Sequence, residues 1–103
     1  MNTIATEIIN KCCKQYLPNC GVLLFGSRVR NDYTEDSDYD FIVITETELS
    51  VEKNREYRHE IRKSLAKNKL AADVLIYSQK EIETKKEIIG HIVRQAIKEG
   101  VRI

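Results

Sequence analysis

Residues 21–27 read Gly-Val-Leu-Leu-Phe-Gly-Ser, and after a polar connection residues 38–44 read Asp-Tyr-Asp-Phe-Ile-Val-Ile. The first stretch is a short apolar run between two glycines, which is the pattern of a buried strand. The second stretch is rich in aromatic and β-branched residues and predicts another strand. A glycine and a serine therefore follow the first predicted strand, and two aspartates begin the second. The connection between them leaves room for a helical turn near its start.

Helical periodicity flanks these two strands. Apolar residues at helical spacing predict an amphipathic helix over residues 3–17, which Pro18 ends because it lacks a backbone donor. A second long helix is predicted over residues 50–68, where Tyr57, Ile61 and Leu65 recur every fourth position. Both helices have one apolar side, so each is expected to pack against the sheet.

The remainder predicts one more strand and a last helical region. Residues 72–77 form a third apolar run, and Ser78 to Glu81 is a capping-box pattern that opens a helix. An apolar stripe of Ile89, Val93 and Ile97 continues this region to Gly100 as a cap, with a break near residues 84–86. The order α-β-β-α-β-α predicts an α/β (α+β) fold, a small mixed sheet flanked by helices, in one domain over residues 1–103.

Composition narrows the class of function. The formal net charge is +1, so the chain lacks the excess of positive charge that binding a long nucleic acid requires. The three cysteines are Cys12, Cys13 and Cys20, an odd number without a Cys-x-x-Cys pair, so we expect reduced thiols. Cys12 and Cys13 lie in the predicted first helix and are expected to help to fill the core. The chain shows neither a signal peptide nor a membrane-spanning run, and a cytoplasmic location is the expectation.

The Gly26-Ser27 pair is the first candidate for chemistry. Glycine lets a ligand approach the backbone closely, and Ser27 offers both a hydroxyl and a backbone N–H to an anion. A helix that starts there would direct further free N–H groups at the same anion. Taken alone, the same pair is also typical of an ordinary turn.

Three aspartates are the second candidate. Side chains alternate along a strand, so Asp38 and Asp40 point to one face, about 7 Å apart at the backbone. Such carboxylates repel each other unless a cation or proton intervenes, and magnesium prefers oxygen ligands of this kind. If the third strand lies beside the second, Asp73 completes a three-carboxylate cluster; otherwise it is a solvated residue at a strand end.

Gly26-Ser27, ten residues, then Asp38-Tyr39-Asp40 resembles the signature of the DNA polymerase beta nucleotidyltransferase superfamily. The run from Gly26 to Arg30 resembles a Gly-Ser-Arg-Ala-Arg-Gly opening, with Asn31 where glycine is usual. The short chain and its closing Glu-Gly-Val at residues 99–101 are similar to the minimal nucleotidyltransferase branch. The resemblance covers nearly the whole chain and implies a polymerase-beta-like nucleotidyltransferase fold.

The resemblance implies transfer of a nucleoside monophosphate from ATP or another nucleoside triphosphate to an acceptor hydroxyl. Asp38 and Asp40 would bind two Mg²⁺ ions, and Asp73 would join them at one ion and help to remove the acceptor proton. Gly26 and Ser27 would hold the triphosphate. Arg28 or Arg30 would neutralise phosphate charge, the alternative being that both are solvated loop residues.

The family also implies a biological setting. Minimal members are often paired with a small helical partner of the HEPN class in toxin–antitoxin pairs, and some transfer AMP to a tyrosine of that partner. A homodimer or a hetero-oligomer is compatible with this setting. Two alternatives stay open at this point. One is a non-catalytic module that neutralises a partner by contact alone, and the other is nucleotidyl transfer to a small molecule.

Overall fold

A computed structural model describes residues 2–103. Helix α1 (Thr3–Tyr16) is followed by strand β1 (Gly21–Phe25) and the short helix α2 (Ser27–Arg30). Strand β2 (Tyr39–Thr45), helix α3 (Val51–Lys67) and strand β3 (Ala72–Ser78) come next. Helices α4 (Gln79–Lys85) and α5 (Ile92–Glu99) and the two-residue strand β4 (Val101–Arg102) complete the chain.

The four strands form one mixed sheet in the order β3-β2-β1-β4. Strand β1 pairs antiparallel with β2 on one side and with β4 on the other. Strand β3 runs parallel to β2, with α3 as the crossover between them, as parallel neighbours require. The predicted mixed sheet flanked by helices is therefore confirmed.

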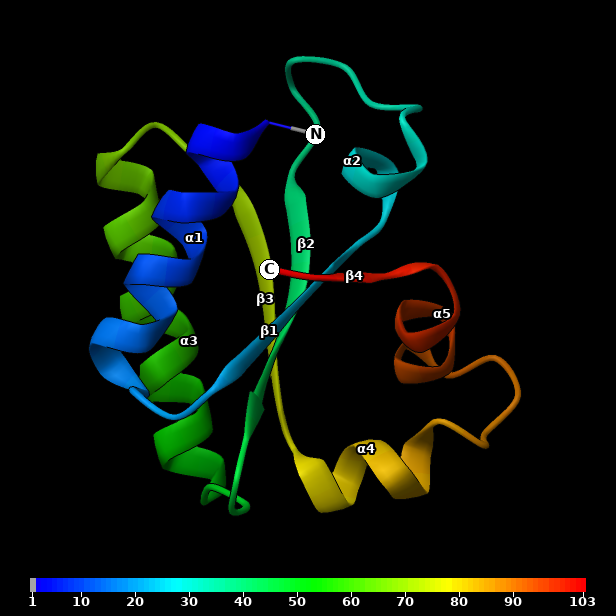
Figure 1. The fold of residues 1–103 in the computed structure, drawn as a ribbon. Helices are drawn as coiled ribbons and strands as arrows, with labels where there is room; N and C mark the ends of the chain where they lie inside the picture. The colour runs from blue at the N-terminus through cyan, green and yellow to red at the C-terminus, as the bar shows by residue number, and fades with distance from the viewer. Residues whose placement is uncertain (1) are drawn as a thin grey trace.

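Two layers of helix cover the sheet (Figure 1). Helices α1 and α3 pack on one face, over a core that includes Val22, Leu24 and Phe41. Helices α4 and α5 pack on the opposite face, over a second core that includes Ile42 and Val93. The predicted place of Cys12 and Cys13 in the core is confirmed, since both are buried, and Cys20 is buried as well.

Most predicted boundaries are confirmed within a residue or two. The capping box that opens α4 is present: the Ser78 hydroxyl accepts from Glu81 N at 3.1 Å, and Glu81 Oε1 accepts from Ser78 N at 2.9 Å. The predicted turn at the start of the polar connection is the helix α2. None of the helices in residues 2–103 is long and apolar enough to cross a lipid bilayer.

The predicted apolar stripe of the last helix is wrong at two of its three positions. Ile89 lies in the turn before α5 and is 87% exposed, and Ile97 is 45% exposed, so only Val93 is buried. The predicted break near residues 84–86 is confirmed, because α4 ends at Lys85 with Lys86 as its C-cap. The interruption then continues through Gly90, whose φ of 84° reverses the chain, and α5 buries Val93 and Ala96. Gly100 does cap α5, and the two-residue strand β4 that follows was not predicted.

Candidate active site

The Gly26-Ser27 turn joins β1 to α2 at the edge of the second core. Gly26 has φ 78° and ψ −160°, a conformation that is costly for any residue with a side chain. Gly26 is the N-cap of α2, and its carbonyl accepts from Val29 N and Arg30 N, both at 3.1 Å, which forms the first turn of this short helix. Asn31 ends the helix at φ 65°, which explains how asparagine stands where the family usually has glycine.

The carboxylates lie across the neighbouring strands from this turn. Asp40 pairs in register with Phe25 of β1 on one side and with Asp73 of β3 on the other. Because Tyr39 and Phe41 belong to the core under α1 and α3, Asp40 points to the opposite face, with Ile42. Asp73 alternates with the buried Val74 and points to that same face. The juxtaposition of strands that the three-carboxylate cluster requires is therefore present.

Asp38 stands one residue before β2 and is exposed, as is Asp73, whereas Asp40 is half-buried. Burial raises the pKa of the Asp40 carboxyl, and the negative charges of Asp73 and Asp38 raise it further. The Arg30 guanidinium partly opposes this shift in the Asp40 pKa. The three carboxylates thus form one electrostatic unit that disfavours ionisation of its central member.

No direct contact within the described residues neutralises this unit, although Arg30 acts on it from a distance. Among residues 2–103, no group donates a hydrogen bond to, or forms an ion pair with, the side-chain carboxylate of Asp38, Asp40 or Asp73. Within the same residues, no three His, Cys, Asp or Glu side chains already converge closely enough to hold a single metal ion. Mutual repulsion keeps like charges apart, and partner-free side chains are free to turn toward a cation.

The two predicted phosphate-binding arginines lie on opposite sides of α2. Residues two apart on a helix are about 200° apart around its axis. The Arg30 guanidinium lies on the carboxylate side, where Nη1 donates to both Glu99 oxygens at 3.1 Å and Nε donates to Asp32 at 3.2 Å. Its influence on the Asp40 pKa follows from that position.

The Arg28 guanidinium turns to the other side and holds the connection between the strands. Its Cζ lies 4.4 Å from the ring centres of both Tyr33 and Tyr39, a cation–π sandwich. Its Nη2 donates to the Ser37 carbonyl at 2.9 Å and to the Glu35 carbonyl at 3.4 Å. Arg28 therefore ties the residues that lead into Asp38 to the start of β2.

Two groups at the site were not predicted from sequence. Glu99, at the end of α5, reaches the Gly26-Ser27 turn through Arg30, and the two tyrosines enclose Arg28. The only signal for Glu99 was its place in the closing Glu-Gly-Val, which says nothing of a contact 69 residues away. The aromatic sandwich has no short-range sequence pattern.

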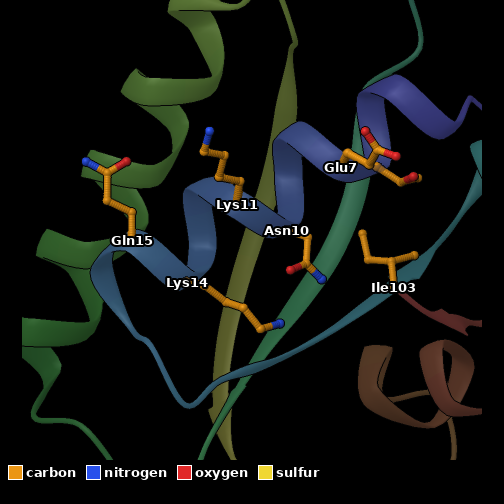
Figure 2. A pocket seen from close by; sticks show the side chains of 7 residues that line it. Glu7, Asn10, Lys11, Lys14, Gln15 and Ile103 are labelled. Atoms are coloured by element: carbon orange, nitrogen blue, oxygen red, sulfur yellow. The ribbon is translucent and has the colours of Figure 1, made fainter.

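A groove of about 840 Å³ lies elsewhere on the molecule, beside α1 and the end of the chain. Figure 2 shows polar side chains of α1 that line it: Glu7 lies near Ile103, whereas Lys11 and Gln15 point away from Ile103. Ile103 packs against the core under α1 and α3, so this groove is on the face opposite the carboxylates. None of the predicted site residues lines it; its lining residues are Thr6, Glu7, Asn10, Lys11, Lys14, Gln15 and Ile103.

Comparison with known proteins bears on this geometry. Residues 6–103 match the family model described as the nucleotidyltransferase domain. No protein of curated function matches the sequence significantly.

Among solved structures, a toxin–antitoxin structure with AMP-PNP is 18% identical over 93% of this chain and 69% of the other, with a TM-score of 0.63. A mutant of the toxin–antitoxin MntA–HpeT is 19% identical over 100% of this chain and 72% of the other, with a TM-score of 0.63. The tri-AMPylated Shewanella oneidensis HEPN toxin in complex with MNT antitoxin is 16% identical over 99% of this chain and 71% of the other, with a TM-score of 0.60. At such identities the likeness establishes the fold.

Proposed function

The chain belongs to the nucleotidyltransferase domain family, and we propose that it transfers a nucleoside monophosphate, AMP from ATP, to a hydroxyl of a partner protein. The observation that carries this proposal is the row of Asp40 and Asp73 across two paired strands, with Asp38 beside it and the Gly26-Ser27 turn next to it. A half-buried carboxylate with two further carboxylates beside it and no hydrogen-bonding partner among the described residues does not stabilise a fold, so the cluster needs a role outside folding.

The donor set fits magnesium. All three candidate ligands are carboxylate oxygens, and the half-buried Asp40 has a raised pKa because its charge is desolvated and repelled, which a cation would relieve. Asp38, Asp40 and Asp73 would hold the metal. When bound, magnesium supplies charge neutralisation for the triphosphate and lowers the pKa of an acceptor hydroxyl.

The chain's own groups have separate tasks in this proposal. The Ser27 hydroxyl has no intramolecular hydrogen bond among the described residues and is available to a phosphate oxygen. Arg30, on the carboxylate side of α2, would pair with the phosphates, while Arg28 would act indirectly by holding the connection that carries Asp38. Asp73 is exposed beside Asp40 and would accept the acceptor proton.

In this reaction the acceptor oxygen forms a bond to the α-phosphorus. The bond from that phosphorus to the bridging oxygen breaks, and pyrophosphate leaves. A HEPN-type partner is the proposed acceptor because chains of the same fold occur in structures named as HEPN toxin–MNT antitoxin complexes. The cluster favours catalysis over contact alone, because contact needs no repelling carboxylates.

Calorimetry tests the site. Magnesium-dependent binding of ATP should occur with the native chain and disappear in the Asp38→Ala, Asp40→Ala double variant. A double variant of Glu35→Ala with Asp36→Ala removes the same charge from the exposed connection and should bind normally. Binding that survives loss of Asp38 and Asp40 would contradict the site assignment.

A further inference from the structure

Glu99 connects the last helix to the predicted phosphate-binding turn. Both of its carboxylate oxygens accept from Arg30 Nη1 at 3.1 Å, and Oε1 also accepts from Gln95 Nε2 at 2.9 Å. Its side chain is only 19% exposed. Burial acts to raise the Glu99 pKa, but the hydrogen bonds from Gln95, Arg30 and the Gly26 backbone N–H outweigh it, so the pKa is lowered. Glu99 is therefore held in its ionised form between α5 and α2.

The end of the chain fixes Glu99 in place. Gly100 N donates to the Ala96 carbonyl at 2.7 Å, and a Cβ on Gly100 would lie only 2.9 Å from Leu23 Cδ1. Strand β4 then pairs with Leu23 and Leu24 of β1, and Ile103 N donates to the Val22 carbonyl at 3.0 Å. These contacts hold the end of α5 against the strand that leads into Gly26, so Glu99 and the turn belong to one packed unit.

The direction of Arg30 depends on this arrangement. Arg30 lies at the end of a four-residue helix and is 43% exposed, so its own short element does little to fix its guanidinium. Glu99 receives Arg30 Nη1 with both of its carboxylate oxygens, and charge-assisted hydrogen bonds of this kind are stronger than bonds between neutral groups. Asp32 accepts from Nε at 3.2 Å on a more exposed side.

We infer that Glu99 is a positioning residue for nucleotide binding: it holds Arg30 and the Gly26-Ser27 turn in the arrangement that receives the triphosphate. The inference rests on the proposed function, since it assigns the turn and Arg30 to the phosphates. Glu99 itself need not touch the nucleotide. Residues 99–103 thus stabilise the position of the phosphate-binding turn.

The first test measures affinity. Calorimetry with magnesium and ATP should show that Glu99→Ala weakens binding about tenfold to a hundredfold, the effect of losing a charged hydrogen bond. Glu99→Gln keeps an acceptor and should lose less. Glu87→Ala removes an exposed glutamate from the turn before α5 and should bind as the native chain does. Because Glu99 acts through Arg30, Glu99→Ala should weaken binding clearly less in an Arg30→Ala background than in the native one.

The second test needs no nucleotide. Hydrogen exchange measured by mass spectrometry should be faster in residues 26–31 of Glu99→Ala, with β2 and α3 unchanged; Glu87→Ala should exchange normally. Unchanged exchange or unchanged ATP affinity in Glu99→Ala would overturn the inference. Tighter ATP binding would overturn it too, since it would mean that Glu99 only repels phosphate. A native chain that binds no triphosphate would instead overturn the proposed function, and the inference with it.

Discussion

Gly26 and Asp40 are in such close contact that a Cβ on Gly26 would overlap Asp40 Oδ2 and lie 3.1 Å from its Cγ. The glycine is therefore required twice, by its backbone conformation and by the carboxylate beside it. The sequence predicts a glycine there for close approach of phosphate. The structure adds that a side chain at this position would displace a candidate metal ligand.

Gly26→Ala should lower the free energy of unfolding by about 1–3 kcal/mol because of its positive φ, and should abolish magnesium-dependent ATP binding because Asp40 must move. Gly90→Ala is the matched control, since Gly90 has φ 84° but open space where its Cβ would be. Urea unfolding should show similar losses in both variants, and calorimetry should show lost binding only in Gly26→Ala. Normal binding by Gly26→Ala would mean that the turn is only structural.

Asp73→Asn should preserve folding and ATP binding but reduce transfer. The substitution is nearly isosteric, so β3 should still pair with β2. In the proposed mechanism Asp38 and Asp40 would still hold a metal on the triphosphate. Loss of a general base costs about a hundredfold to ten-thousandfold in rate, so the effect belongs in turnover rather than affinity. The measurement is labelled-nucleotide transfer to the partner. Transfer at the native rate would make Asp73 an ordinary strand-end residue.

Asp40→Asn should stabilise the metal-free protein at pH 7 while removing its function. The folded-state pKa of Asp40 is raised, so its ionised form destabilises the fold, and this penalty grows as pH rises through that pKa. The thermal midpoint should rise by a few degrees at pH 7, where 1 kcal/mol corresponds to about 4–8 °C in a domain of this size. The gain should shrink as pH falls toward the ordinary range of aspartate.

Two controls accompany that prediction. Asp36→Asn changes an exposed aspartate of the connection and should leave the thermal midpoint unchanged. Added magnesium should raise the midpoint of the native chain but not that of Asp40→Asn. An Asp40→Asn chain that is less stable than the native one at pH 7 would show that the carboxyl has a structural partner.

Arg28→Ala should cost about 1–2 kcal/mol of stability, because it removes two cation–π contacts and the hydrogen bonds to the connection. It should also weaken magnesium-dependent ATP binding, since Asp38 follows directly from Ser37. Arg55→Ala, at an exposed position of α3, should stay within about 0.5 kcal/mol of the native chain. If Arg28→Ala unfolds in urea at the same concentration as the native chain, Arg28 does not hold the connection in place.

Short-range pattern accounts for the parts of the fold that the sequence predicts. The apolar run before Gly26 and the alternation through Asp40 and Ile42 are local, and they place the turn and two carboxylates on neighbouring strands. Asp73 could be placed only conditionally, because register between β2 and β3 is a tertiary property.

The remainder depends on contacts between distant residues. Glu99 meets Arg30 from the far end of the chain, and Arg28 meets Tyr33 and Tyr39 through a folded connection. Strand β4 has only two residues, too few for a period to show. The helical stripe through Ile89 and Ile97 had the right spacing, but a glycine reversal, which periodicity does not register, put Ile89 outside the helix.

Covalent modification of a partner at the carboxylate cluster would change the mass of that partner. The measurement is the intact mass of the protein that co-purifies with the native chain, before and after incubation with magnesium and ATP. We expect a partner heavier by one or more AMP units with the native chain, and an unmodified partner with the Asp38→Ala, Asp40→Ala double variant. A co-purified partner that stays unmodified with the native chain, magnesium and ATP would rule out the proposed transfer and favour neutralisation by contact alone.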